Sequence, residues 1–169
     1  MGIYFLENMD LTHPEDYYIR LLLNKVKIAE IMNRKVISIR EDEPFSRVEQ
    51  KLREFNIRHL PVVNADGRLV GIITQRDLFR IQSPRRLEDG SWYYDPKSLD
   101  AYILTNVMTP NPTVLNPRDS LAQVILLMSD TKYGCIPIVE NKLCGIITQY
   151  DIIKIAARIL REGTKAGEG

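Results

Sequence analysis

Two short segments of this chain place a threonine and an aspartate at one spacing, Thr74-Gln75-Arg76-Asp77 and Thr148-Gln149-Tyr150-Asp151. Each follows an apolar run and opens a segment with helical periodicity. At a helix start, Thr-x-x-Asp can form a capping box, in which the side chains satisfy the helix's own N–H groups. The carboxylate can instead accept hydrogen bonds from both hydroxyls of a ribose, and free N–H groups at a helix start suit a phosphate. The motif alone leaves both interpretations open.

The motif belongs to a longer internal repeat. Gly71-Ile72-Ile73-Thr74-Gln75-x-Asp77 recurs 74 positions later as Gly145-Ile146-Ile147-Thr148-Gln149-x-Asp151. Upstream, Met32, Val48 and Pro61 correspond to Met108, Val124 and Pro137 at an offset of 76. The offset changes at the turn signal 64–67, which is shortened in the second copy. Repetition of this kind predicts one structural unit built twice.

Each copy predicts the element order β-α-β-β-α. The expected first strands are 35–39 and 112–115, and the next helices begin at Glu43-Pro44 and after a cap at Asp119 or Ser120. The expected hairpins pair 60–63 with 69–73 and 136–139 with 143–147, and Pro61 and Pro137 favour an edge or a strand start. The last helices are expected at Asp77–Ile81 and Asp151–Leu160. We therefore predict an α+β fold of two β-α-β-β-α repeats with pseudo-two-fold symmetry, plus an N-terminal helix.

The predicted organisation has five parts. They are an N-terminal helical extension (1–25), repeat 1 (26–82), a polar, turn-rich linker (83–102), repeat 2 (103–160) and a flexible tail (161–169).

Composition excludes several classes of function. The chain has 169 residues and a net charge of +1, which gives no electrostatic footprint for nucleic acid. No apolar stretch approaches the ~18 residues of a membrane span, and no signal peptide is apparent, so we expect a cytoplasmic protein. His13 and His59 are the only histidines, and no nucleophile–base pair or metal cluster is visible. We predict no catalytic residue, no metal site and no enzymatic activity.

The two-copy pattern resembles a tandem pair of CBS domains, also called a Bateman module. The resemblance rests on the order of elements, the paired prolines and the paired Gly-Ile-Ile-Thr-Gln-x-Asp, and it covers about 26–81 and 103–159. It implies a regulatory sensor that binds AMP, ADP, ATP or another adenosyl compound in clefts between the repeats. It also implies a homodimer that needs no other cofactor and signals to an effector protein by conformational change.

The family's ligand motif falls on 56–61 with 73–77, and on 132–137 with 147–151. The resemblance implies the following ligand-binding residues: Ile37, Ser38, Ile57, Arg58, His59, Pro61, Thr74, Arg76, Asp77, Thr113, Lys132, Tyr133, Cys135, Pro137, Thr148 and Asp151. Asn56 and Lys132 stand where the motif has a glycine, and Asn56 suits a left-handed backbone.

The two copies differ in cations for a phosphate. Arg58 and His59 precede Pro61, and the gamma subunit of AMP-activated kinase is similar in carrying basic residues at those positions. Repeat 2 has Gly134 and Cys135 there, and Lys132 is its only obvious cation. We expect two similar clefts with different affinities or ligands, and Arg58 and His59 can serve either cleft. The alternatives are a dimerisation or interaction module with vestigial clefts, S-adenosylmethionine binding, and nucleic-acid binding, which the neutral charge disfavours.

Overall fold

The computed structural model describes residues 13–82, 85–93 and 99–165. Its helices are α1 (Pro14–Lys25), α2 (Ile28–Ile31), α3 (Ser46–Glu54), α4 (Gln75–Gln82), the 3-10 helix η1 (Leu99–Ala101), α5 (Leu104–Val107), α6 (Leu121–Thr131) and α7 (Gln149–Lys165). Its strands are β1 (Ile39–Arg40), β2 (His59–Val63), β3 (Leu69–Thr74), β4 (Arg85–Arg86), β5 (Trp92–Tyr93), β6 (Thr109–Pro110), β7 (Cys135–Val139) and β8 (Leu143–Thr148). The α+β class predicted from the sequence is confirmed.

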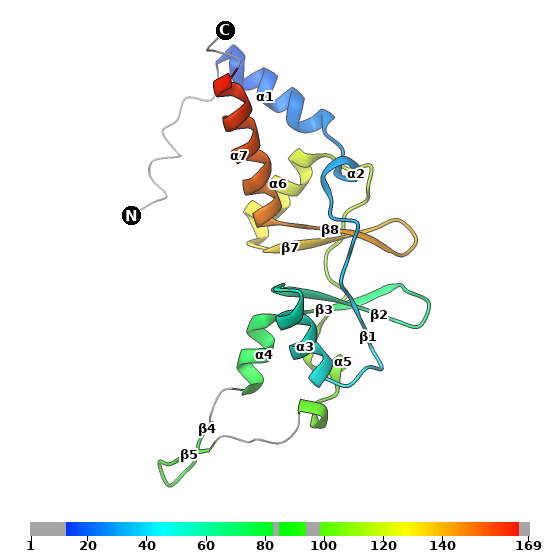
Figure 1. The fold of residues 1–169 in the computed structure, drawn as a ribbon, viewed down its shortest axis with the longest axis vertical. Helices are drawn as coiled ribbons and strands as arrows, with labels where there is room; N and C mark the ends of the chain where they lie inside the picture. Colours follow the sequence, from blue (N-terminus) through cyan, green and yellow to red (C-terminus); the bar gives the residue numbers. More distant parts are fainter. Residues whose placement is uncertain (1–12, 83–84, 94–98, 166–169) are drawn as a thin grey trace.

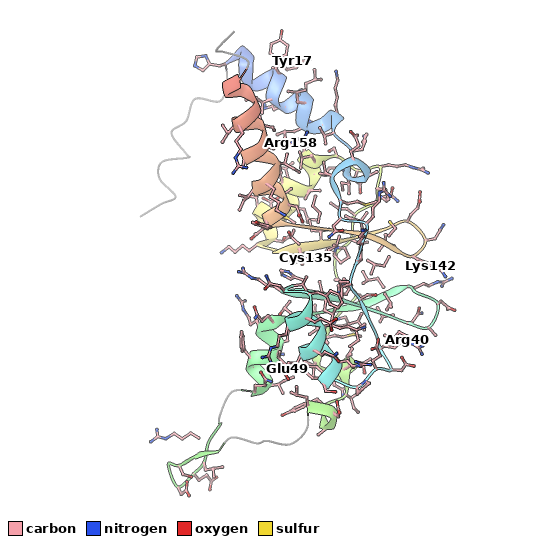
Figure 2. All side chains as sticks on the ribbon, in the orientation of Figure 1. Tyr17, Arg40, Glu49, Cys135, Lys142 and Arg158 are labelled. Carbon is pink, nitrogen blue, oxygen red and sulfur yellow. The ribbon has the colours of Figure 1, made fainter. Side chains whose placement is uncertain are left out.

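The strands of the two repeats face each other in the middle of the molecule, and helices lie on the outer side of each strand layer (Figure 1). The sheet of repeat 1 has the strand order β1-β2-β3-β6 and includes β6 from the start of repeat 2; β1 is parallel to β2, and the other pairs are antiparallel. Repeat 2 has the antiparallel pair β7–β8, flanked by single bridges at Leu115 and Asn33. The turn at Lys142 lies beside the β2–β3 turn (Figure 2), where Leu143 N–H donates to the Gly67 carbonyl at 3.4 Å.

The two packed units exchange their first helical turn. Ile28 and Met32, from α2 and its end, lie in the core of repeat 2, whereas Leu104 and Met108, after the linker, pack in the core of repeat 1. Two glycines make room for this exchange. A Cβ on Gly145 would lie 2.3 Å from Met32 Sδ, and one on Gly71 would lie 2.3 Å from Met108 Sδ. The repeated segments of the sequence therefore do not coincide with the packed units.

Several features of the helices and strands differ from those predicted. The helix expected from Glu43-Pro44 begins at Ser46, because the Glu43 carboxylate accepts from Arg40 N–H at 2.8 Å and holds a turn. Pro61 lies in β2, an interior strand. Pairing with β1 starts only at Val62, so no bond to β1 needs the N–H group that proline lacks. Ser120, one of two predicted caps, forms a capping box with Gln123.

The motif glycine positions both have left-handed backbones. Asn56 follows α3 with φ of 48°, and Lys132 ends α6 with φ of 59°. Lysine disfavours this conformation, yet Lys132 adopts the same left-handed backbone as Asn56 at the corresponding position.

The segments outside the repeats are described in part. Helix α1 packs against α6, and the β4–β5 hairpin within the linker stands away from both repeats (Figure 1). Helix α7 runs to Lys165, so residues 161–165 of the predicted tail are helical, and 166–169 lie outside the described residues, as do 1–12 of the extension. Within the described ranges, none of the helices combines the length and apolar character needed to cross a membrane.

Candidate functional site

A cleft of about 530 Å³ opens between the two repeats. Its lining comes from four stretches of the chain, two in repeat 1 and two in repeat 2: Asn33, Lys35, Val36, Ile37, Asn56, Ile57, Arg58, His59, Gly134, Ile146, Thr148, Gln149, Tyr150 and Asp151. The Thr-x-x-Asp motif of repeat 2 therefore meets the Arg58-His59 pair of repeat 1. The sequence left open which motif these two cations accompany.

One wall of the cleft is the segment that crosses from one repeat to the other. Asn33 pairs with Ile146 of β8, and Ile39 pairs with Val62 of β2. Between them, half-buried Val36 and Ile37 make no backbone hydrogen bond to any described residue. The predicted strand 35–39 is thus reduced to its last residue. Half-buried backbone polar groups without protein partners are free to bind a ligand in the cleft.

The capping box that competed with ribose binding is present in both repeats. Thr148 N–H and Oγ1–H donate to Asp151 Oδ2 at 2.9 and 2.6 Å, and Asp151 N–H lies 3.3 Å from Thr148 Oγ1. Thr74 and Asp77 repeat the three distances. Each aspartate thus uses one carboxylate oxygen to start its helix. Capping and ligand binding do not exclude each other, because each carboxylate has a second oxygen.

The second oxygen differs between the repeats. Asp77 Oδ1 forms an ion pair with Arg80 at 3.5 Å. Asp151 Oδ1 has no hydrogen-bond or ion-pair partner among the described residues, and Asp151 lines the cleft. The corresponding cation in repeat 2, Lys154, instead lies over the Tyr150 ring at 4.4 Å. Asp151 therefore presents a free acceptor to the cleft.

Two basic residues and a histidine line the same cleft as this acceptor. Arg58 and Lys35 are exposed, and His59 is half-buried. Burial lowers the pKa of His59, and the neighbouring Arg58 charge lowers it further. The imidazole is therefore neutral at pH 7, and a bound anion beside it would favour its protonated form.

The lowered His59 pKa predicts a pH-dependent stability. As the pH falls, His59 takes up a proton near its ordinary pKa of 6.5 in the unfolded chain and at a lower pH in the folded protein. The stability that neutral His59 contributes is therefore complete above about pH 6.5, and it is lost as the pH falls toward the pKa of His59 in the folded protein. In urea unfolding at pH 7.5 and 5.5, we expect wild type to lose more stability than His59→Gln. An equal loss of stability in wild type and in His59→Gln would contradict the assignment.

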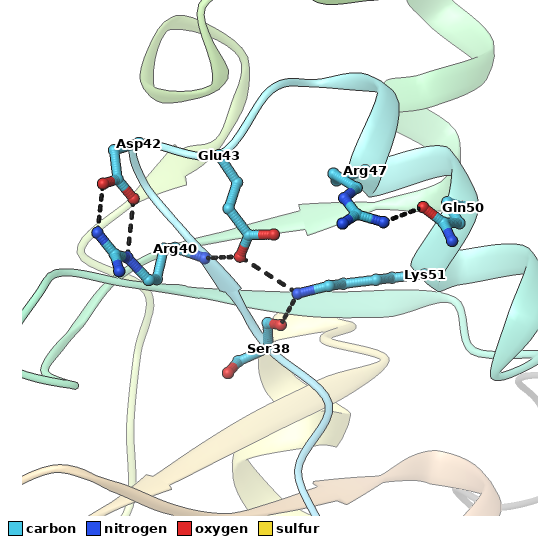
Figure 3. Close-up of polar contacts among 7 residues, drawn as sticks. All are labelled: Ser38, Arg40, Asp42, Glu43, Arg47, Gln50 and Lys51. Atoms are coloured by element: carbon cyan, nitrogen blue, oxygen red, sulfur yellow. Dashed lines mark hydrogen bonds and ion pairs between the residues drawn. The ribbon is translucent and has the colours of Figure 1, made fainter.

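A polar network fixes the wall near Ile37 (Figure 3). Lys51 of α3 donates to the Ser38 carbonyl at 2.8 Å and to Glu43 Oε1 at 3.2 Å. Partial burial would raise the pKa of Glu43, but the Arg40 N–H and Lys51 outweigh it and lower that pKa. Leu127 replaces Lys51 in repeat 2, so only repeat 1 ties this segment to its helix.

Lys51→Met should loosen that wall. The variant keeps most of the apolar stem and removes the bonds to Ser38 and Glu43, so we expect the free energy of unfolding to fall by about 1 kcal/mol. Arg47→Met is the matched control on the same helix, because the Arg47 side chain donates a hydrogen bond to exposed Gln50 and none to Ser38 or Glu43. Urea unfolding should show a change within about 0.5 kcal/mol for the control. Equal effects of the two substitutions would show that the tie to Ser38 contributes nothing.

The predicted site residues divide into two sets. Those lining the cleft are Ile37, Ile57, Arg58, His59, Thr148 and Asp151. Those outside its lining are Ser38, Pro61, Thr74, Arg76, Asp77, Thr113, Lys132, Tyr133, Cys135 and Pro137. Eight further lining residues were not predicted as ligand-binding: Asn33, Lys35, Val36, Asn56, Gly134, Ile146, Gln149 and Tyr150. Their positions beside the first strand, the motif proline and the Thr-x-x-Asp motif were the available signal.

Cys135 is buried at the start of β7 and follows the cleft residue Gly134 in the sequence. Its burial, together with the negative charge of Asp151, raises the pKa of its thiol to about 12. The sulfur is therefore protonated at neutral pH and is a packing group rather than a nucleophile. In the described ranges, no three His, Cys, Asp or Glu side chains group as metal ligands.

Comparison with known proteins gives the same two-part pattern. Residues 28–83 and 104–158 each match the CBS domain family. A CBS domain-containing protein of Dictyostelium discoideum is 28% identical over 139 residues, covering 80% of this chain and 94% of that protein. A homoserine O-acetyltransferase of Methanococcoides burtonii is 28% identical over 142 residues, covering 83% of this chain and 26% of the enzyme.

Two solved structures have a similar fold. CBSX2 in complex with AMP has a TM-score of 0.65 and 22% identity, covering 79% of this chain and 98% of that one. The CBS domain pair of protein MJ0100, in complex with 5′-methylthioadenosine and S-adenosyl-L-methionine, has a TM-score of 0.64 and 22% identity, covering 78% and 96%. The chain belongs to the CBS domain family and carries two CBS domains in tandem.

Proposed function

We propose that this protein is a regulatory module that binds an adenine nucleotide in the cleft between its repeats. The observation that carries the proposal is the meeting of Asp151 from repeat 2 with Arg58 and His59 from repeat 1. One wall offers an acceptor and the other offers cations, across a space of about 530 Å³. Such a pocket suits a ligand with a diol and a negative charge.

Each part of a nucleotide has a partner in the cleft. Asp151 Oδ1 accepts from the ribose hydroxyls as a charge-assisted bond. Arg58, His59 and Lys35 bind the phosphate, and the Arg58 guanidinium provides two parallel donors. The backbone of Val36 and Ile37 bonds to the base, whose polar edge satisfies groups that have no backbone hydrogen-bond partner among the described residues. The AMP bound by CBSX2 supports this ligand class.

The cations favour a nucleoside phosphate over S-adenosylmethionine. The MJ0100 domain pair binds S-adenosyl-L-methionine and 5′-methylthioadenosine, and Asp151 can hold the ribose of either class. Arg58 and Lys35, however, repel a sulfonium and attract a phosphate. Binding changes the conformation of the module only through a difference in affinity between two states, and we propose that an effector protein reads that difference.

The proposal includes a homodimer and no catalytic activity. Helices α4 and α7 expose large apolar side chains: Phe79 (59%), Tyr150 (64%), Ile153 (62%) and Leu160 (74%). Phe79 and Ile153 are equivalent in the repeat, and a second copy of the chain would cover both. Cys135 and Cys144 are both free thiols, which supports a location in the reducing cytoplasm.

A thermal-shift panel with AMP, ADP, ATP, S-adenosylmethionine and NADH tests this function. A nucleotide at ~100 times its dissociation constant should stabilise wild type by ~2.7 kcal/mol. Arg58→Ala should lose most of the response to AMP, whereas Arg53→Ala, an exposed arginine of α3 outside the cleft, should keep it. Absence of any response in wild type would support the vestigial-cleft alternative, and a response to S-adenosylmethionine alone would favour that ligand.

A further inference from the structure

Gly134 has no backbone reason to be a glycine. It occupies the position in repeat 2 that Arg58 occupies in repeat 1. Among the described glycines, only Gly67 and Gly90 have a positive φ, so the backbone of Gly134 suits any L residue. A glycine there must be explained by its surroundings.

His59 fills the space that a side chain at position 134 would take. A Cβ on Gly134 would lie 2.9 Å from Nε2 and 3.1 Å from Cε1 of the His59 ring. Apart from the adjoining residues, these are the only described heavy atoms within 4 Å of that Cβ. The Gly134 carbonyl is held by Gln149 N–H at 3.1 Å, at the start of α7. The imidazole, rather than the glycine backbone, would have to move.

We propose that Gly134 is a positioning residue for His59, because its missing side chain leaves the place where the imidazole of the other repeat enters the cleft. This inference deepens the nucleotide-binding function, and its effect on affinity rests on that function. It also accounts for a difference between the repeats, in which Gly134 of repeat 2 stands at the position of Arg58 in repeat 1. A side chain at position 134 and the imidazole of His59 in its present place exclude each other, so this placement of His59 requires a glycine in repeat 2.

NMR titration of the unligated protein tests the placement without any nucleotide. The chain has two histidines, and His59→Gln identifies the His59 imidazole signal. In Gly134→Ala, the displaced ring becomes more exposed, so its signal should shift and its pKa should rise toward the ordinary 6.5. An unchanged His59 signal and titration in Gly134→Ala would overturn the proposal, whether or not the protein binds nucleotides.

Calorimetric titration with AMP tests the consequence by a double-mutant cycle. Gly134→Ala should weaken AMP binding about tenfold in wild type and less than about twofold in a His59→Ala background. The double variant has no ring to displace, so it also shows that alanine at position 134 is compatible with folding. Equal weakening with and without His59 would overturn the positioning role. If wild type binds no AMP, the proposed function fails, and the NMR titration still decides whether Gly134 positions His59.

Discussion

Gly145→Ala should lower the free energy of unfolding by about 2 kcal/mol, because the added methyl group overpacks the contact with Met32 and Ile138. The new Cβ would lie 2.3 Å from Met32 Sδ, 3.0 Å from Met32 Cγ and 3.3 Å from Ile138 Cβ. The methionine is flexible, but Ile138 is fully buried in β7 and cannot retreat. Urea unfolding followed by circular dichroism measures the loss.

A second substitution shows whether Met32 is responsible. Met32→Ala removes the clashing side chain, so Gly145→Ala should cost much less in that background than in wild type. Gly71→Ala with Met108→Ala is the matched pair in repeat 1. A full cost of Gly145→Ala in the absence of Met32 would contradict the exchanged packing of the first helical turns.

Asp151→Ala should weaken AMP binding roughly 10- to 100-fold, whereas Asp77→Ala should change it little. The expected loss corresponds to a hydrogen bond with a charged group, about 1.5–3 kcal/mol. Both aspartates cap their helices through bonds of the same lengths. Both variants should therefore lose about 1 kcal/mol of stability. Calorimetric titration with AMP measures binding separately from this loss of helix capping.

Asp77→Ala is thus the matched control for Asp151→Ala. It removes the same capping box and leaves the cleft lining intact. If the two variants lost AMP affinity equally, the loss would follow from weakened helix starts or from a second site at Asp77. If neither lost affinity, Asp151 would act only as a cap.

Much of the fold could be predicted because the repeat makes each copy evidence for the other. The hairpins β2–β3 and β7–β8, and the helices after them, follow from apolar runs that end at Thr74 and Thr148. Boundaries shifted where local contacts compete, as at Glu43, whose carboxylate holds a turn that residue pattern alone does not show.

The composition of the cleft could be predicted only in part. Local motifs identified Arg58, His59 and Asp151, but the pairing of a repeat 1 motif with a repeat 2 motif depends on how the two units stack. The exchanged packing of Met32 and Met108 also could not be predicted from the sequence. Each helical turn is adjacent in the chain to one repeat but packs in the core of the other. Val36 and Ile37 contribute backbone groups, which side-chain types do not reveal.

A crystal structure of the protein with AMP tests the central claim most directly. We predict the ribose hydroxyls at Asp151, the phosphate at Arg58 and His59, and the base against the backbone of Val36 and Ile37. AMP bound at Asp77 with the cleft at Asp151 empty would contradict this account.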